Sequence, residues 1–250
     1  MEIAFIVQAR SGSTRLPNKM NMPFYGNEAI LDIILNRLKT NFKDIPVILA
    51  TTVNSKDDAI VEIGNRNQVE VYRGSEDNVL SRFIEAAKVF SVKHVIRICA
   101  DNPFISTCYL KELIEFYRSE NKNYVSFISE SGLPAMKTHY GFFAEITSLE
   151  TLQKTAEKTH DPFYCEHVTN YIYGNPDFFS LNFLKIPFEI EKANIRLTVD
   201  TSEDFTICKE IYSYLMNHNS SIEPVSIIKY INDNPDFLSV MKDQINLNKK

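Results

Sequence analysis

Residues 3–19, IAFIVQARSGSTRLPNK, contain a short apolar run followed by a loop with three cations, one glycine and several hydroxyl side chains. The run at residues 3–7 predicts a buried strand, because it is apolar and rich in β-branched side chains. Similar runs, each leading into polar or small residues, lie at residues 47–51, 69–72 and 94–99. Helical patterns separate the four runs, and this alternation is typical of βαβ units with a largely parallel sheet.

Polar residues that favour helix starts precede these helical patterns. Asn27 and Asp77 stand before periodic sets of apolar residues, and Ser55 stands before two acidic residues, Asp57 and Asp58, that suit a first helical turn. We therefore expect helices to begin near these three residues. A further helix is expected at residues 109–118, and it leads to a fifth predicted strand at residues 124–128.

The rhythm changes after residue 128. We interpret residues 129–190 as a small insertion whose apolar surface is a candidate dimer interface. Within it we expect a strand at residues 140–146, helices near residues 149–158 and 164–173, and an alternating run at residues 178–184. The main domain would comprise residues 1–128 and 191–245, with a strand at residues 195–199, a helix from about residue 202 and a helical stretch at residues 225–241.

The composition restricts the class of protein. The chain of 250 residues is 44% hydrophobic and 12% aromatic, which is enough for a sizeable core. Its formal net charge of -5 argues against a nucleic-acid or anionic-membrane partner, because those partners favour a basic surface. The run at residues 3–7 is too short for a signal peptide or a membrane span, so we expect a cytoplasmic protein. The four cysteines have no CxxC or metal-binding spacing and are expected to be reduced thiols in the core.

Ligands in open α/β sheets bind outside the carboxyl ends of the strands, so the residues after each run are the candidate site. After the first run, Arg10, Arg15 and Lys19 accompany Gly12 in a loop that suits a polyphosphate, because backbone N–H groups can approach an anion and the cations add directed charge. The alternative is a solvated, cation-rich surface loop. The loop lacks the Gly-Lys-Ser/Thr of a Walker motif, and the seven glycines form no GxGxxG, which argues against a P-loop ATPase and a dinucleotide-binding protein.

Residues 8–19 resemble the opening signature of the cytidylyltransferase family that includes the CMP-sialic acid and 3-deoxy-manno-octulosonate synthetases, and they are most similar to its spore-coat-polysaccharide branch. Later blocks of that branch recur in order, at residues 50–58, 72–82, 97–103, 166–169 and 197–204. The resemblance covers residues 3–205. It implies a Rossmann-like, GT-A-like nucleotidyltransferase fold, with a mostly parallel sheet, helices on both faces and a small inserted subdomain.

The resemblance also implies roles for individual residues. The nucleotide-binding positions of the family correspond to Gln8, Ala9, Arg10, Ser11, Gly12, Arg15, Lys19, Thr51, Arg73, Ser75, Arg82 and Asp101. Of these, the three loop cations match residues that bind the triphosphate, and the three residues of the 72–82 block lie near the cytosine and ribose in the family. The implied catalytic residues are Arg10, Lys19, Asp101 and Asp200. The two aspartates among them match the carboxylates that hold Mg²⁺.

The positions of the two aspartates agree with a metal site. Asp101 follows the run at residues 94–99, and Asp200 follows the run at residues 195–199. One or two carboxylates, with phosphate oxygens and waters, make a typical Mg²⁺ site. The simpler alternatives are an Asx turn or a helix cap at Asp101 and a helix cap at Asp200. The pair supports a metal site only if the two runs are neighbours.

The candidate acceptor-binding residues are Lys137, His139, Glu145, Glu166 and His167. The first two lie in a loop that could bind an acidic group, and the last two fall in a block shared with the family. A solvated loop and a structural histidine are the alternatives. The branch usually has acidic or charged residues where this chain has Phe143 and Tyr164-Cys165, so the identity of the acceptor stays open.

The sequence therefore predicts a Mg²⁺-dependent cytidylyltransferase that moves CMP from CTP to a small anionic acceptor and releases pyrophosphate. By resemblance, the acceptor is a sugar acid of surface glycan biosynthesis or else a phosphorylated small molecule. From the apolar surface of residues 129–190 we expect a homodimer. A nucleotide-sugar glycosyltransferase is the rival enzyme, but Pro103 stands where an Asp-x-Asp motif starting at Asp101 would have its second aspartate. A catalytically silent nucleotide-binding subunit is the third candidate, although it would keep costly charges without a ligand.

Overall fold

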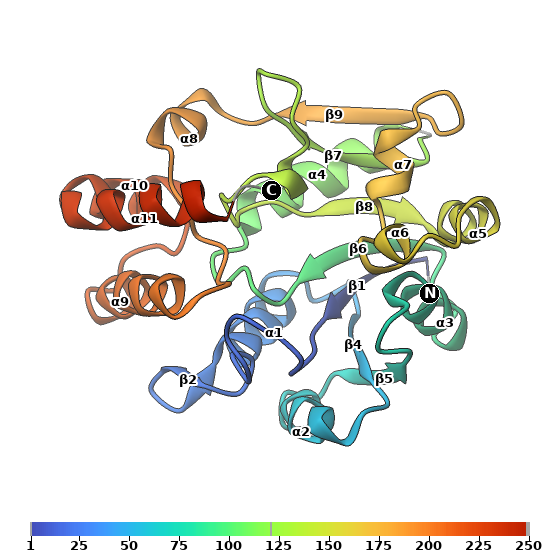
Figure 1. The fold of residues 1–250 in the computed structure, drawn as a ribbon, viewed down its shortest axis with the longest axis horizontal. Coiled ribbons are helices and arrows are strands. Elements are labelled where there is room, and N and C mark those ends of the chain that lie inside the picture. The colour runs from blue at the N-terminus through green and yellow to red at the C-terminus, as the bar shows by residue number, and fades with distance from the viewer. Residues whose placement is uncertain (1, 121, 249–250) are drawn as a thin grey trace.

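The computed structural model describes residues 2–120 and 122–248, and in this part of the chain seven strands form one sheet, in the order β5-β4-β1-β6-β8-β7-β9 (Figure 1). The strands are β1 (Ile3–Gln8), β4 (Val47–Thr52), β5 (Glu70–Gly74), β6 (His94–Cys99), β7 (Tyr124–Ile128), β8 (Glu145–Ser148) and β9 (Leu181–Lys185). β8 is antiparallel to both of its neighbours, and the other pairs are parallel. The mostly parallel sheet predicted from the sequence is confirmed, as are its first five strands.

β1 is buried on both faces, which explains its uninterrupted apolar sequence. Phe5 and Val7 point into one hydrophobic core, whereas Ala4 and Ile6 point into a second. Four helices link the strands of the first half of the chain: α1 (Ile30–Asn41), α2 (Asp58–Arg66), α3 (Val79–Val89) and α4 (Thr107–Ser119). α1, α2 and α4 pack into the first core and α3 into the second, so helices cover both faces of the sheet. Each apolar side chain fully buried in this way contributes about 1.5–3 kcal/mol.

The helix starts lie near the predicted residues but not at them. Asn54 caps a 3₁₀ turn, Ser55–Asp57, that leads into α2, and Asn78 caps α3; each side chain accepts a hydrogen bond from a backbone N–H of the next turn. Asn27 instead lies in the turn of a short hairpin formed by β2 (Pro23–Tyr25) and β3 (Glu28–Ala29). The first helix therefore begins three residues later than Asn27, at Ile30.

Residues 129–190, the predicted insertion, contribute β8 and β9 to the main sheet. Their helices are α5 (Leu149–Lys158), α6 (Pro162–Glu166), α7 (Asn170–Gly174) and the start of α8 (Phe188–Ala193), which extends past residue 190. The predicted strand at residues 140–146 begins only at Glu145, where pairing with β6 starts. The single helix predicted at residues 164–173 is wrong, because a turn at residues 167–169 interrupts it and directs the Thr169 hydroxyl to Glu145.

The strand predicted at residues 195–199 is also wrong, since this segment is extended but joins neither sheet. Its backbone bonds to two loops instead: the Leu197 N–H donates to the His139 carbonyl, and the Val199 N–H donates to the Asp101 carbonyl, each at 2.8 Å. The segment nevertheless runs beside Asp101 and leads into α9 (Ser202–Asn217).

The helical stretch predicted at residues 225–241 consists of two helices, α10 (Pro224–Asn232) and α11 (Pro235–Leu247). Pro235 separates them, because proline cannot donate the backbone hydrogen bond that would continue the first helix. α11 contacts both α9 and α10, and the three helices form one group beside the sheet (Figure 1). This packing brings Asn248, directly after α11, to the loop that follows β1.

Candidate active site

A cleft of about 800 Å³ opens at the carboxyl ends of β1 and β6, where Gln8 and Cys99 end the two strands. This is where open α/β sheets bind ligands. The predicted site residues that line the cleft are Gln8, Ala9, Arg10, Gly12, Arg15, Lys19, Arg82, Asp101, Lys137, Glu166, His167 and Asp200. The predicted residues that do not line it are Ser11, Thr51, Arg73, Ser75, His139 and Glu145.

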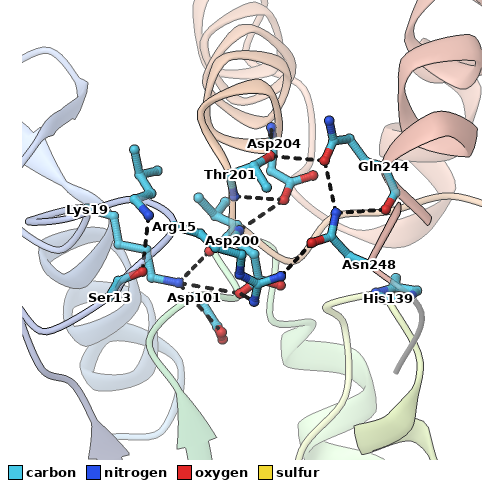
Figure 2. A network of polar contacts seen from close by, with 12 residues as sticks. Ser13, Arg15, Lys19, Asp101, His139, Asp200, Thr201, Asp204, Gln244 and Asn248 are labelled. Carbon is cyan, nitrogen blue, oxygen red and sulfur yellow. Dashed lines mark hydrogen bonds and ion pairs between the residues drawn. The ribbon is translucent and has the colours of Figure 1, made fainter. Parts of the chain in front are cut away.

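Lys19 lies between the two aspartates. Its ammonium Nζ is 3.9 Å from Asp101 Oδ2 and 3.6 Å from Asp200 Oδ1, and it donates a 2.5 Å hydrogen bond to the Val199 carbonyl (Figure 2). The backbone bond between Val199 and Asp101 fixes the two loops side by side. The two aspartates are therefore neighbours, although residues 195–199 are not a strand, and Lys19 partly neutralises both carboxylates.

The other two loop cations also contact polar groups from distant parts of the chain. Arg15 lies 3.2 Å from Asp200 Oδ1 and donates to Asn248 Oδ1 at 2.6 Å (Figure 2). Arg10 donates to Glu166 Oε1 at 2.9 Å, across the cleft from the loop to the end of α6. Each cation of the loop is thus engaged by at least one acidic side chain. The four ion pairs that these three cations make lie at the cleft, where an anionic ligand could replace the carboxylates.

Arg82 is a buried cation that faces the cleft from α3, with 2% of its surface exposed. Its Nη1 donates to the Ser75 carbonyl at 2.8 Å, and within residues 2–120 and 122–248 no carboxylate lies within 4 Å of it. Burial and the nearby charge of Arg10 lower the pKa of Arg82 to about 10, although Asp57 and Glu76 act in the opposite direction. A buried guanidinium without a close counterion is suited to an anionic or hydrogen-bond-accepting ligand.

Three buried side-chain atoms in the cleft have no hydrogen-bond partner among the described residues: Arg82 Nε, Asn102 Oδ1 and Thr198 Oγ1. An unsatisfied buried polar atom costs about 1–3 kcal/mol, so such atoms are rare in a folded protein. Their gathering in one cleft indicates a polar ligand. Asn102 and Thr198 were not among the predicted site residues, although they stand next to Asp101 and close to Asp200 in the family blocks.

Asp57 holds the cation loop through a hydrogen bond to its backbone. It was not among the predicted site residues. Its Oδ1 accepts the Ser11 backbone N–H at 2.7 Å, and its Oδ2 accepts the hydroxyls of Thr51 and Thr52 at 3.0 and 2.6 Å. Ser11 and Thr51 therefore hold the loop through Asp57. The recurring block at residues 50–58 was the signal in the sequence, since it contains Thr51, Thr52 and Asp57 together.

Replacing Asp57 by Asn should lower the free energy of unfolding by about 2 kcal/mol at neutral pH, because a buried carboxylate that accepts four hydrogen bonds is lost. Burial alone would raise the pKa of Asp57, but the hydrogen bonds from Thr52, Ser11 and Thr51 hold it below its ordinary value of 3.8. The carboxylate thus stabilises the fold above pH 3.8, and this contribution is lost as the pH falls through the lower folded pKa.

Urea unfolding of the wild type and Asp57→Asn at several pH values between 2 and 7 tests this. The difference between the two proteins should shrink in the acid range. A difference that is constant over the whole range would show that ionised Asp57 is not the anchor.

Arg73 and Ser75 brace the loops behind the cleft. Arg73 donates to the carbonyls of Thr52 and Asn54 at 2.9 and 2.8 Å and pairs with Asp58 at 2.7 Å. The Ser75 hydroxyl accepts a backbone N–H from the residue that caps α3. In this arrangement neither side chain reaches the cleft, and of the predicted trio only Arg82 lines it.

Of the acceptor candidates, Lys137, Glu166 and His167 line the cleft, whereas His139 and Glu145 do not. Lys137 Nζ lies 5.4 Å from the ring centre of Tyr173, and both side chains line the cleft together with Glu166 and His167. The His139 Nδ1 is 2.6 Å from Nη1 of the buried Arg196. Because a guanidinium has donors only, this ring nitrogen must be the acceptor.

Arg196 is fully buried, and Asp204 accepts two hydrogen bonds from it at 2.7 and 2.8 Å, while Asp200 accepts one at 3.0 Å. This ion cluster fixes the start of α9 and aims one oxygen of Asp200 away from the cleft. The other oxygen, Oδ1, faces Lys19 and Arg15. Asp200 therefore joins the loop cations to the body of the fold.

Residues 2–120 and 122–248 contain no group of three or more His, Cys, Asp and Glu side chains that could hold a metal ion. Among the same residues, no helix has the length and apolar character needed to cross a membrane.

Comparison with known proteins agrees with the geometry. The cytidylyltransferase family model matches residues 4–232. The chain is 36% identical over 240 residues to an uncharacterized protein of Methanocaldococcus jannaschii, covering 96% of this chain and 94% of that protein. It is 30% identical over 240 residues to the spore coat polysaccharide biosynthesis protein SpsF of Bacillus subtilis, covering 94% of this chain and 96% of that protein.

A solved cytidylyltransferase structure from Leptospira borgpetersenii has the same fold, with a TM-score of 0.81 at 29% identity, covering 95% of this chain and 96% of that one. The family match includes the cation loop, Asp101 and Asp200. The chain belongs to the cytidylyltransferase family and is a CTP-dependent nucleotidyltransferase.

Proposed function

We propose that this enzyme transfers CMP from CTP to an oxygen atom of a small anionic acceptor, with release of pyrophosphate, in the biosynthesis of a surface glycan. The observation that carries the proposal is the convergence of three loop cations and two aspartates on one cleft. The name of the Bacillus subtilis relative supports the role in a polysaccharide.

In the proposed reaction an acceptor oxygen attacks the α-phosphorus of CTP in line with the departing pyrophosphate. Arg10, Arg15 and Lys19 hold the triphosphate and stabilise the charge that develops on the leaving group. Their carboxylate partners would give way to phosphate oxygens, and Arg82 would satisfy its free Nε on the nucleotide. Positioning and electrostatic stabilisation supply most of the rate enhancement in such a transfer.

The residues present fit a Mg²⁺ ion. Asp101 and Asp200 would hold it, since one oxygen of each carboxylate lies within 4 Å of the Lys19 ammonium and hard cations prefer oxygen ligands. Two further oxygens, Asn102 Oδ1 and Thr198 Oγ1, belong to residues that line the same cleft and have no hydrogen-bond partner within residues 2–120 and 122–248. A bound ion would neutralise charge on the phosphate oxygens.

Lys137 supports an anionic acceptor. It lines the cleft on the side of α6 and α7, and no carboxylate among the described residues lies within 4 Å of it. Its charge is thus available for a carboxylate or phosphate group of the acceptor. A sugar acid is our first choice and a phosphorylated small molecule our second, and both satisfy this contact.

Glu166→Gln should separate the two substrates. The change removes the carboxylate that engages Arg10, so CTP should bind about two- to fivefold more tightly, as expected for the loss of a partly exposed ion pair. The acceptor should bind less well, because Glu166 lines the cleft opposite the loop. Calorimetric titration with CTP and the acceptor KM measure the two effects.

Glu150→Gln is the matched control, since it breaks an exposed ion pair with Lys154 on α5, outside the cleft. Weakened CTP binding together with unchanged acceptor saturation would contradict the assignment of Glu166 to the acceptor.

Residues 129–190 are the proposed acceptor-binding and dimerisation region. Phe163 and Phe178, both in this region, expose more than half of their surface. An apolar surface of this kind fits a homodimer, and light scattering of the purified protein gives the oligomeric state.

The proposed reaction is tested by incubation with CTP, Mg²⁺ and a panel of sugar acids and phosphate esters, with products identified by mass spectrometry. A CMP conjugate and equimolar pyrophosphate support the proposal. Release of a nucleoside diphosphate from a nucleotide-sugar would indicate a glycosyltransferase, and CTP binding with no product from any acceptor would indicate a silent subunit.

A further inference from the structure

Glu145, on β8, is a fully buried carboxylate with 0% of its surface exposed. Tyr124 donates to its Oε2 at 2.5 Å, and Thr169 donates to both oxygens at 2.8 and 3.0 Å. Arg97 completes the set, with Nη1 2.5 Å from Oε1. The carboxylate is therefore locked in one orientation, and it does not line the cleft, contrary to a direct role in binding the acceptor.

Arg97 connects Glu145 to Gln8, which lines the cleft. It lies on β6 between β8 and β1, so its guanidinium reaches Glu145 on one side and Gln8 on the other. Its Nε is 2.9 Å from Gln8 Oε1. A guanidinium has donors and no acceptor, so the Gln8 atom that faces it must be the amide oxygen.

The NH₂ group of Gln8 is consequently the end of the amide that remains for a ligand. Gln8 lines the cleft, and its NH₂ group has no hydrogen-bond partner among residues 2–120 and 122–248. It stands two residues before Arg10, at the start of the loop that holds the phosphate-binding cations. The amide thus presents two donors to the nucleotide side of the cleft.

We infer that buried Glu145 is a positioning residue: acting through Arg97, it fixes the amide of Gln8 so that the Gln8 NH₂ group donates a hydrogen bond to an acceptor atom of the bound nucleotide. The inference rests on the proposed function, since it takes CTP as the nucleotide. It explains why a carboxylate that does not line the cleft is held by four hydrogen bonds.

Titration calorimetry with CTP tests this inference on four variants. Gln8→Leu removes the donors, and Gln8→Glu keeps an oxygen for Arg97 but loses the NH₂ group. Both should weaken CTP binding about tenfold or more, the effect of leaving one hydrogen bond unmade. Glu145→Gln should weaken it similarly, because Arg97 loses its charged partner and no longer fixes the amide.

The double variant Gln8→Leu/Glu145→Gln should bind CTP no more weakly than the weaker single variant, since both changes remove the same contact. The matched control is Glu223→Gln, which breaks another hydrogen-bonded Arg–Glu pair, with Arg37, away from the cleft. This control should lower the melting temperature without changing CTP affinity.

The outcomes distinguish the inference from the proposed function. A wild-type protein that does not bind CTP would overturn the proposed function. If the wild type binds CTP but Gln8→Glu binds equally well, or if the two losses multiply in the double variant, the inference fails while the proposed function stands.

Discussion

Replacing Asp101 by Asn should lower kcat about a hundredfold or more, which corresponds to about 3 kcal/mol of transition-state stabilisation. Its side chain is 31% exposed and has one ion pair, with Lys19 at 3.9 Å. The fold therefore depends little on the carboxylate, and the melting temperature should stay within a few degrees of the wild type. Steady-state kinetics at several Mg²⁺ concentrations measure the loss, and high Mg²⁺ should restore part of it.

Asp200→Asn should reduce kcat similarly but also affect stability, because Asp200 contacts the buried Arg196. Asp204 keeps two hydrogen bonds to Arg196, so the variant should still fold. The decrease in kcat of the double variant should be much smaller than the product of the two single decreases, since the two carboxylates act as one unit. If the single variants have a near-normal kcat, or if their decreases in kcat multiply and do not depend on Mg²⁺, both aspartates are only structural caps.

Replacing Lys19 by Met should weaken CTP binding about a hundredfold, the upper range for a charge-assisted hydrogen bond in a buried site. Met keeps the apolar stem but removes the charge that lies between Asp101 and Asp200. The two carboxylates would then repel one another, so the melting temperature should also fall.

Arg10→Ala should weaken CTP binding with little effect on stability, because the side chain of Arg10 is 35% exposed.

Calorimetric titration with CTP and thermal unfolding measure both effects of Lys19→Met. Lys154→Met, which removes an exposed cation from α5, is the control and should change neither quantity appreciably. A normal CTP affinity in Lys19→Met would remove the cation loop from the nucleotide site.

Local patterns in the sequence were sufficient for the sheet and for several helices. The strand at residues 124–128 and the helix at residues 149–158 have the predicted bounds, because each has its own periodicity. Residues 195–199 have an equally strong strand pattern but form no strand. Their partners are the carbonyls of His139 and Asp101, in loops whose position depends on the whole fold.

Site residues that belong to recurring sequence blocks could be predicted from the sequence. Residues whose role depends on contacts with distant parts of the chain could not. Arg10, Lys19, Asp101 and Asp200 stand in recurring blocks and meet in the cleft. Glu145 has no local signal for burial, because the groups that hold it come from two other strands, β6 and β7, and from the turn before α7. The role of Asp57 could not be predicted for the same reason. Asp57 joins the loop after β1 to the end of β4, and only the folded chain brings these two segments together.

The central claim is that the cleft splits CTP between its α- and β-phosphates and transfers CMP. In the most direct measurement, the wild type is incubated with Mg²⁺, CTP labelled at the α-phosphate and an acceptor identified in the panel, and the products are then separated. We expect the label in a CMP–acceptor conjugate and unlabelled pyrophosphate in equal amount. Label found in CDP, or labelled CTP left intact while a nucleotide-sugar donates its sugar to the same acceptor, would contradict the account.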